Sequence, residues 1–169
     1  PVYYADPEAR KFYRRPGVIK AVKAEFGSEV FDTNDELRST VLAGIVFKDA
    51  TRLARLNAII HPLVLEDFHE WAGACAGEGY LLYESALLFE SGFHKHFDLS
   101  ILVRAPEKLA CKRVMARDGI TRTEFYERFS RQMPVDKKIP QADFIIDNNE
   151  ASPLIPRIID IHNQILARL

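Results

Sequence analysis

Two arginines, Arg113 and Arg117, lie four residues apart in a basic segment that follows the apolar run 99–103. At this spacing two side chains share one face of a helix and can contact the same ligand. A guanidinium group suits an anionic ligand, because its planar fork matches the oxygens of phosphate and carboxylate groups. The pair therefore indicates a shared ligand, whereas the structural alternative is a solvated basic helix face.

Asp6 is the candidate for proton transfer. The apolar, aromatic stretch 1–6 predicts a short strand that ends at Asp6, and Pro7 suits the first turn of a helix. A carboxylate at the end of a strand can accept a proton from a hydroxyl group. The structural alternative is a helix N-cap, because Asp is also a good capping residue.

The elements that position these residues follow from hydrophobic spacing. Amphipathic helices are predicted at three segments, the last of them bent or interrupted at Pro62: 17–27, 35–47 and 50–72. Buried strands are predicted at two short apolar runs, 99–103 and 143–147. The segment 80–90 opens with a third apolar run, which predicts a buried strand that continues into a loop of the site.

Alternation of strands and helices predicts a parallel sheet that is covered by helices on both faces. Ligands of such α/β sheets bind beyond the carboxyl ends of the strands. The residues that follow the apolar runs are therefore the candidate site: Asp6, Glu84 to Glu90, Arg104, Asn148 and Asn149.

Length and composition limit the function classes. The chain has 169 residues, 47% of them hydrophobic, which predicts one globular domain. Its net charge of −1 argues against a surface for nucleic acid or an anionic membrane that covers the whole protein, and leaves room for a local basic cluster. Cys75 and Cys111 are far apart and lack the spacing of metal ligands, so each is predicted to be a small buried side chain. No signal peptide or long apolar stretch is present, and we expect a cytoplasmic protein.

Five segments occur in the order found in dephospho-coenzyme A kinases: YYADPEAR (3–10), LNAIIHPLV (56–64), LLFESG (87–92), CKRVMARDGITR (111–122) and RQMPVDKKIPQADFIIDNN (131–149). The chain resembles this family over nearly its whole length. These enzymes transfer the γ-phosphoryl group of ATP to the ribose 3′-hydroxyl of dephospho-CoA, the last step of coenzyme A biosynthesis. The resemblance implies an α/β fold of P-loop kinase type, with a three-layer parallel sheet.

The resemblance also implies the roles of individual regions and residues. A helical substrate subdomain would cover about 35–75, and an arginine-bearing lid about 117–138. Asp6 would be the catalytic base. The residues that would contact or support the substrate are Arg10, His61, Pro62 and Glu90, of which Glu90 has a second interpretation as the residue that holds the mobile subdomain.

On the ATP side, Arg113 would stack on adenine and Arg117 would pair with phosphate. The other residues assigned to ATP and the lid are Arg122, Arg128 and Asn148, whereas Arg131 is interpreted as a solvated residue. The expected cofactors are ATP and Mg²⁺, with the metal bridging the β- and γ-phosphates and no direct protein ligand. The expected partners are ATP and dephospho-CoA, bound to a monomer without nucleic acid or membrane.

One departure from the family concerns phosphate binding. Relatives begin with a strand and a G-x-x-x-x-G-K-[ST] loop, and none of the eight glycines of this chain lies in such a pattern. We expect that roughly 25 to 30 residues upstream of Pro1 supply this strand and loop, and that residues 1–169 alone are inactive. Ala86 and Tyr4 also differ from the residues that are common in the family.

Two alternatives stay open at the level of sequence. One is another small-molecule P-loop kinase of the adenylate or uridylate kinase type, against which the His61–Pro62 run and the segment 142–149 argue. The other is a nucleotide- or CoA-binding module that uses the same scaffold without catalysis.

Overall fold

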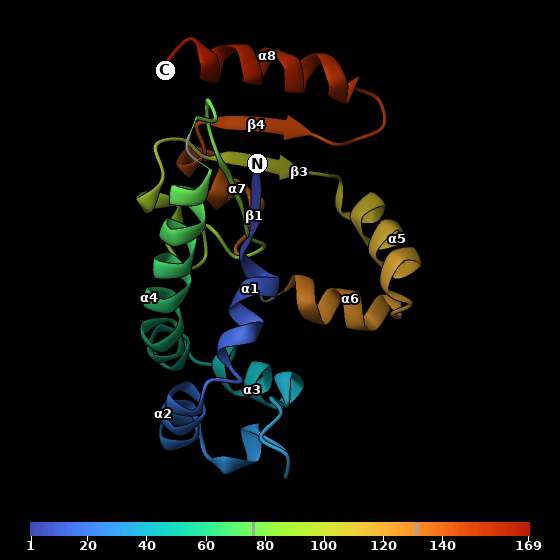
Figure 1. Cartoon of the computed structure of the whole chain (residues 1–169). Coiled ribbons are helices and arrows are strands. Elements are labelled where there is room, and N and C mark those ends of the chain that lie inside the picture. The colour runs from blue at the N-terminus through green and yellow to red at the C-terminus, as the bar shows by residue number, and fades with distance from the viewer. Residues whose placement is uncertain (76, 131) are drawn as a thin grey trace. The chain divides into compact units, whose positions relative to one another are not determined.

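The computed structural model describes residues 1–75, 77–130 and 132–169 (Figure 1). The chain divides into two compact units, Pro1–Ala86 and Leu87–Leu169, and each is described by itself. The first unit contains β1 (Val2–Tyr4), α1 (Ala5–Phe12), α2 (Pro16–Phe26), α3 (Ser39–Val46), α4 (Ala50–Ala74) and β2 (Leu82–Glu84), with a 3₁₀ turn at Ser28–Val30. The second contains β3 (Ile101–Arg104), α5 (Glu107–Asp118), α6 (Arg122–Phe129), α7 (Val135–Lys138), β4 (Phe144–Asp147) and α8 (Leu154–Leu166), with 3₁₀ turns at Phe93–His96 and Ile139–Gln141.

The two strands of the first unit are parallel. Val2 pairs with Leu82 and Tyr4 with Glu84, so both strands end at the same edge. The strand predicted at the opening of 80–90, ahead of a loop, is confirmed in its place by β2. Its predicted burial is wrong, because Leu82 is 40% exposed. Burial in these strands is limited to residues that face the helices, and in β1 that residue is Tyr3.

Four helices enclose the core of the first unit. α4 packs against α1, α2 and α3, and its buried residues Leu56, Ile60 and Val64 join the same cluster as Val22 and Val30. An aromatic group caps this core, because the ring of Tyr3 lies 5.4 Å from Phe68 and Trp71 and 5.5 Å from Tyr83. The Tyr3 hydroxyl donates a 2.6 Å hydrogen bond to Asp67.

The helix α2 confirms the prediction for 17–27. Val18, Val22 and Phe26 are buried at intervals of four residues, which gives the helix one apolar face. Gly27 ends the helix with a φ of 96°, a backbone conformation that favours glycine.

The predicted start of α3 at Asp35 is wrong, because a turn occupies the preceding residues. Asp32 accepts hydrogen bonds from the backbone N–H groups of Asn34 and Glu36, at 2.8 and 2.9 Å. Asp35 has a φ of 59°, which is incompatible with a right-handed helix. The helix therefore starts at Ser39.

The predicted interruption at Pro62 is also wrong. α4 runs through Pro62 without a break and starts at a capped end, where Asp49 accepts hydrogen bonds from the N–H groups of Thr51 and Arg52. Pro62 removes one intrahelical donor. The apolar face that α4 buries on both sides of Pro62 keeps the helix continuous.

In the second unit β3 and β4 form a parallel pair, and α8 packs along β4 (Figure 1). Ile101 pairs with Phe144 and Arg104 with Asp147. The two predicted strands are confirmed in position, but they are not buried throughout, because Val103 is 59% exposed.

Ser100 and Asp143 fasten the starts of these two strands together. One oxygen of Asp143 accepts hydrogen bonds from the backbone N–H and the hydroxyl of Ser100, both at 2.8 Å. These bonds hold the pKa of the Asp143 carboxyl below its ordinary value, against the opposing effect of partial burial.

The turn between α5 and α6 has a clear local cause. Gly119 ends α5 with a φ of 68°, and Thr121 starts α6 by a capping box in which Thr121 and Glu124 bind each other's backbone N–H groups. Cys111 on α5 is buried as predicted, whereas Cys75 is half-buried, which corrects the prediction for that residue.

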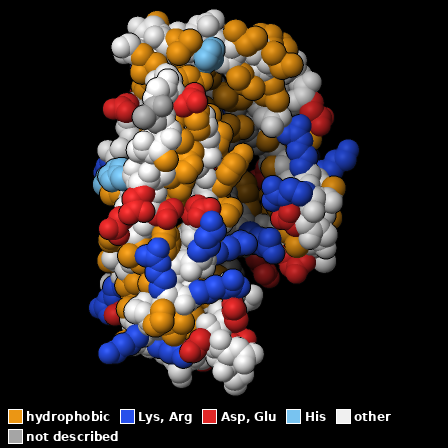
Figure 2. All heavy atoms as spheres, viewed as in Figure 1, with side chains coloured by type: hydrophobic (Ala, Val, Ile, Leu, Met, Phe, Trp, Pro, Cys, Tyr) orange, Lys and Arg blue, Asp and Glu red, His pale blue; other side chains and the backbone are white. Residues whose placement is uncertain are grey.

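Charged side chains of both signs lie on the face of the molecule that Figure 2 shows. Figure 2 shows Lys and Arg side chains interspersed with Asp and Glu on the face in view, in keeping with the net charge of −1. Of the helices in the described part of the chain, none is long and apolar enough to cross a membrane.

Candidate active site

Asp6 lies at the edge where β1 and β2 both end. Its carboxylate accepts hydrogen bonds from the Ser85 hydroxyl at 3.4 Å and from the Ala86 backbone N–H at 3.3 Å. Ser85 and Ala86 directly follow β2, so the first turn of α1 and the loop after β2 meet at this carboxylate. The side chain is exposed, as a group that meets a substrate must be.

The local position of Asp6 differs from the prediction in one respect. β1 ends at Tyr4, and α1 already starts at Ala5, so Asp6 is the second residue of the helix. The N-cap residue is Tyr4, and no side chain caps this end. The N-cap role considered for Asp6 is therefore wrong, and its hydrogen bonds run to the loop after β2 instead.

Tyr83, the middle residue of β2, shares the surroundings of Asp6. Burial raises the pKa of the Tyr83 phenol well above its ordinary value, and the negative charge of Asp6 raises it further. Tyr83 therefore stays protonated near neutral pH. Of these two neighbours, Asp6 is the one that can accept a proton.

The predicted substrate residues of the first unit lie on α1 and α4. Arg10 follows Asp6 by one turn of α1, is exposed, and forms no ion pair with any described residue. His61 is half-buried on α4, and Pro62 is exposed beside it. These residues and Asp6 lie on two helices, α1 and α4, that pack together.

The structure brings Arg113 and Asn148 together beyond the ends of β3 and β4. One guanidinium nitrogen of Arg113 donates to the Asn148 carbonyl at 3.1 Å, and another pairs with Glu150 at 3.3 Å. The Asn148 N–H in turn donates to the Arg104 carbonyl at 2.8 Å. These contacts hold the guanidinium plane of Arg113 at the edge where α/β sheets bind ligands.

Arg104 itself, another predicted site residue, is engaged by Asp147. The two side chains form a pair of hydrogen bonds at 2.6 and 3.3 Å across the ends of β3 and β4. The guanidinium lowers the pKa of the Asp147 carboxyl. This pairing gives Arg104 a role in joining the strands.

Two of the arginines that the sequence assigned to a lid converge on one carboxylate. Arg117 forms two hydrogen bonds with Asp118, at 2.6 and 3.1 Å, and Arg128 approaches the same carboxylate at 3.8 Å. The hydrogen bond from Arg117 lowers the pKa of Asp118. Both arginines are largely exposed, so Asp118 holds them at the surface without enclosing them.

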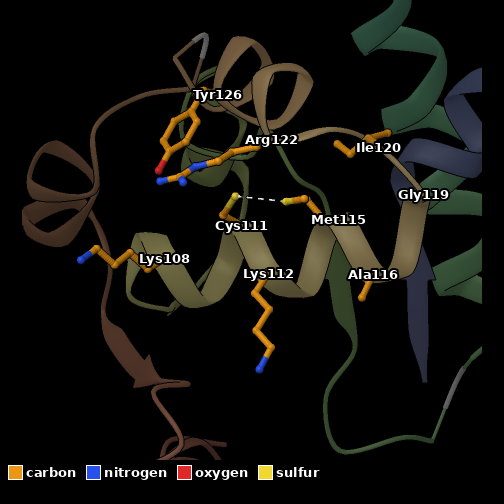
Figure 3. A pocket seen from close by; sticks show the side chains of 9 residues that line it. All are labelled: Lys108, Cys111, Lys112, Met115, Ala116, Gly119, Ile120, Arg122 and Tyr126. Carbon is orange, nitrogen blue, oxygen red and sulfur yellow. Dashed lines mark hydrogen bonds between the residues drawn. The ribbon is translucent and has the colours of Figure 1, made fainter.

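Arg122 occupies a different place from Arg113. It starts α6 and lies over the ring of Tyr126, 5.7 Å from the centroid, at a pocket of about 740 Å³ between α5 and α6 (Figure 3). Cys111 and Met115 face the same pocket, with their sulfur atoms 3.6 Å apart. Arg113 is two residues beyond Cys111 on α5, and thus points from another side of that helix.

Glu90 is enclosed in the second unit. Its Oε1 atom lies 2.5 Å from the Lys138 ammonium group and accepts a 3.0 Å hydrogen bond from the Met133 backbone N–H. The side chains of Glu90 and Lys138 are each 10% exposed. Arg131, which the sequence placed in the same region, falls outside the described residues.

Three residues of the candidate site were missed at the level of sequence. They are Asp118, Lys138 and Glu150. Asp118 had a local signal, because it directly follows Arg117. Lys138 had none, since a lysine after Lys137 has the pattern of a solvated helix end.

Metal binding by the protein alone has no structural support in the described residues. Among residues 1–75, 77–130 and 132–169, no group of three or more His, Cys, Asp or Glu side chains is arranged to hold an ion. Mg²⁺ that is bound to a nucleotide needs fewer protein ligands, because phosphate oxygens and water fill most of its positions.

Parallel strand pairs that pack against helices place the chain in the α/β class. Comparison with known proteins gives the family. The family model for dephospho-CoA kinase matches residues 1–153. A dephospho-CoA kinase of Bacteroides fragilis is 35% identical over 162 residues, which are 95% of this chain and 78% of the relative. One from Salinibacter ruber is 34% identical over 151 residues, or 88% and 76% of the two chains.

Solved structures agree with this assignment. A crystal structure from Thermus thermophilus matches with a TM-score of 0.78 and 30% identity, covering 100% of this chain and 84% of the other. A dephospho-CoA kinase from Campylobacter jejuni shares the fold with a TM-score of 0.60 and 23% identity, covering 98% and 85%. The chain therefore belongs to the dephospho-CoA kinase family, an ATP-dependent phosphotransferase of coenzyme A biosynthesis, and the predicted P-loop kinase fold is confirmed.

Proposed function

We propose that this chain moves the γ-phosphoryl group of ATP to the ribose 3′-hydroxyl of dephospho-CoA, with Asp6 as the general base. The observation that carries the proposal is the position of Asp6 at the shared edge of β1 and β2. Phosphoryl transfer needs an aligned acceptor, a proton acceptor and neutralisation of charge, and little covalent help.

Asp6 receives the proton of the acceptor hydroxyl. The Ser85 hydroxyl and the Ala86 N–H bind its two carboxylate oxygens from one side and thereby fix the plane of the group. Both contacts are long, so the oxygens keep lone pairs for a further hydrogen bond with the acceptor hydroxyl.

Arg10, His61 and Pro62 bind or support the acceptor substrate. An exposed guanidinium one turn from the base, without a partner among the described residues, suits the phosphate groups of dephospho-CoA. The helical region at about 35–75, which includes α3 and α4, forms the wall that receives the remainder of this substrate.

Arg113 and Asn148 bind the adenine end of ATP. The Asn148 carbonyl orients the guanidinium of Arg113, which offers a flat face for stacking. The lid at about 117–138 supplies Arg117 and Arg128 to the phosphates, where they exchange the Asp118 carboxylate for phosphate oxygens. Arg122 belongs to this lid and packs on Tyr126 at its base.

Mg²⁺ would enter with ATP and would help to neutralise the charge that develops during transfer. Asp6 is the described carboxylate that would contact this ion through water. We further propose a cytoplasmic monomer, in keeping with two cysteines that are both free.

A substrate panel tests the reaction. The purified full-length protein is given ATP and Mg²⁺ with dephospho-CoA, AMP or UMP, and the products are identified by mass and by the position of the new phosphate. We expect transfer to the 3′-hydroxyl of dephospho-CoA alone. Faster phosphorylation of AMP or UMP would support an adenylate or uridylate kinase, and ATP binding without transfer would support a binding module.

A pair of variants tests the substrate side. Arg10→Ala should raise the KM for dephospho-CoA by about tenfold or more, with a smaller change in kcat, because a charge-assisted hydrogen bond to phosphate is lost. Lys11→Ala is the matched control, since Lys11 is the next residue of α1 and binds Glu8 at the surface. Equal KM values for the two variants would remove Arg10 from the substrate site.

A further inference from the structure

Glu90 and Lys138 form a buried ion pair that joins two distant segments of the second unit. The carboxylate lies 2.5 Å from the ammonium group, and it also accepts the Met133 N–H at 3.0 Å. Lys138 is the last residue of α7, and Met133 precedes that helix. One carboxylate thus holds both ends of the segment 133–138.

Stability alone does not explain this pair. Removing two charges from water costs about as much as their attraction returns, so an apolar pair of similar volume would serve a structural core equally well. The second oxygen of Glu90, Oε2, is enclosed and has no hydrogen-bond partner within the part of the chain that the structure describes. An ion pair does, however, fix two segments in one arrangement more specifically than apolar contacts do.

The loop that leads to Glu90 starts at the two residues that bind the candidate base. Ser85 and Ala86 donate hydrogen bonds to Asp6, and four residues beyond Ala86 the same loop reaches Glu90. Between them the chain is compact, because the Ser91 N–H donates to the Leu87 carbonyl at 3.0 Å. A short, folded piece of backbone therefore joins Glu90 to the two donors that bind Asp6.

We propose that Glu90 and Lys138 are positioning residues that couple the lid to the loop that orients Asp6. The inference rests on the proposed function, which supplies the lid at about 117–138 and the base. Lys138 closes that lid segment, so movement of the lid arginines onto phosphate pulls on the ion pair. The pair passes this movement to the loop 85–90 and sets the donors of Asp6 for transfer.

This role differs from direct contact between Glu90 and the substrate. Oε1 is already occupied by two donors, and Oε2 is enclosed. A substrate contact predicts a higher KM for dephospho-CoA when Glu90 changes. A positioning role predicts a lower kcat with little change in that KM.

Three variants of the full-length protein test the coupling: Glu90→Gln, Lys138→Met and the double variant. Each single variant leaves one buried polar group without its charged partner, so both should melt at a lower temperature. The double variant carries neither charge, and the amide oxygen that replaces the Glu90 carboxylate still accepts the Met133 N–H, so thermal stability should return. Its kcat should nevertheless stay on the order of 10²-fold below wild type, because the geometry of the base is no longer fixed.

The matched control is Lys137→Met. It removes a lysine from the same short helix, but from an exposed position beside the buried one. This control should keep the wild-type melting temperature. A double variant with wild-type kcat, or a change confined to the KM for dephospho-CoA, would overturn the coupling.

A second readout does not depend on turnover. The Ala86 N–H donates to Asp6, so its hydrogen exchange reports how firmly the loop is held. In the double variant we expect this exchange to be on the order of tenfold faster than in wild type. Unchanged exchange at Ala86 would refute the coupling, whereas faster exchange in a protein that transfers no phosphoryl group would refute the proposed function alone.

Discussion

Replacement of Asp6 by Asn separates the chemical role of this side chain from its structural one. Asn has nearly the same volume and keeps one acceptor oxygen for the Ser85 hydroxyl or the Ala86 N–H, which contact Asp6 at 3.4 and 3.3 Å. It cannot accept the proton of a hydroxyl group near neutral pH. Loss of a general base lowers kcat by roughly 10²- to 10⁴-fold, equivalent to about 2.7–5.4 kcal/mol in the activation barrier.

The effect on folding should be much smaller. One of two long hydrogen bonds is lost, which is worth about 1 kcal/mol or less, and the melting temperature should fall by less than about 4 °C for a chain of this size. The affinity for ATP should change little, since arginines of the second unit are assigned to that ligand. Asp6→Asn should therefore change the activation barrier much more than the free energy of unfolding.

Steady-state kinetics and melting curves of the full-length protein give both quantities. Glu8→Gln is the matched control, because it removes another first-turn carboxylate of α1 and so reproduces any effect on the helix dipole. A kcat for Asp6→Asn that equals the kcat of this control would refute the assignment of Asp6 as the base.

Three other changes test separate parts of the structure. Arg117→Ala should lower kcat by on the order of 10³-fold if this side chain meets the charge of the transferring phosphoryl group, and near wild-type turnover would return it to a solvated helix face. Asp118→Asn should lower the KM for ATP by less than about fivefold, because it frees Arg117 from a competing surface ion pair; a higher KM in the kinetic assay would contradict this. Asp143→Asn should destabilise the protein at pH 7, and the difference from wild type in urea unfolding should shrink below about pH 4. Folding holds the pKa of Asp143 below its ordinary value. The carboxylate therefore stabilises the folded protein at any pH above the ordinary pKa, and this stabilisation disappears as the pH falls through the folded-state pKa.

Sequence patterns predicted correctly those helices that are determined by neighbouring residues in the chain. α2 has buried residues at regular spacing and a glycine at its end, and both signals are visible in the sequence. The start of α3 was predicted too early, because the Asp32 turn depends on side-chain bonds to backbone groups that periodicity does not report. The continuity of α4 through Pro62 depends on packing against three other helices, which outweighs the loss of one hydrogen bond.

The candidate site was predictable where the strand-end rule applies. That rule identified Asp6, Arg104 and Asn148, and the structure places each at or beyond the end of a parallel strand. It could not supply the partners, because an ion pair such as Glu90–Lys138 forms between segments that only the tertiary fold brings together. The chemical roles of the site residues stay predictions that the variants above address.

The aromatic group around Tyr3 also gives the first unit an intrinsic fluorescent probe. Trp71 is the single tryptophan of the sequence, and its ring lies 5.4 Å from Tyr3 and 5.9 Å from Phe68. At this separation the excitation of Tyr3 passes to the indole, so the emission of Trp71 reports on the surroundings of α4. Under the proposed function, addition of dephospho-CoA should quench or shift this emission without any label, and Tyr126→Trp would add a separate signal in the proposed lid.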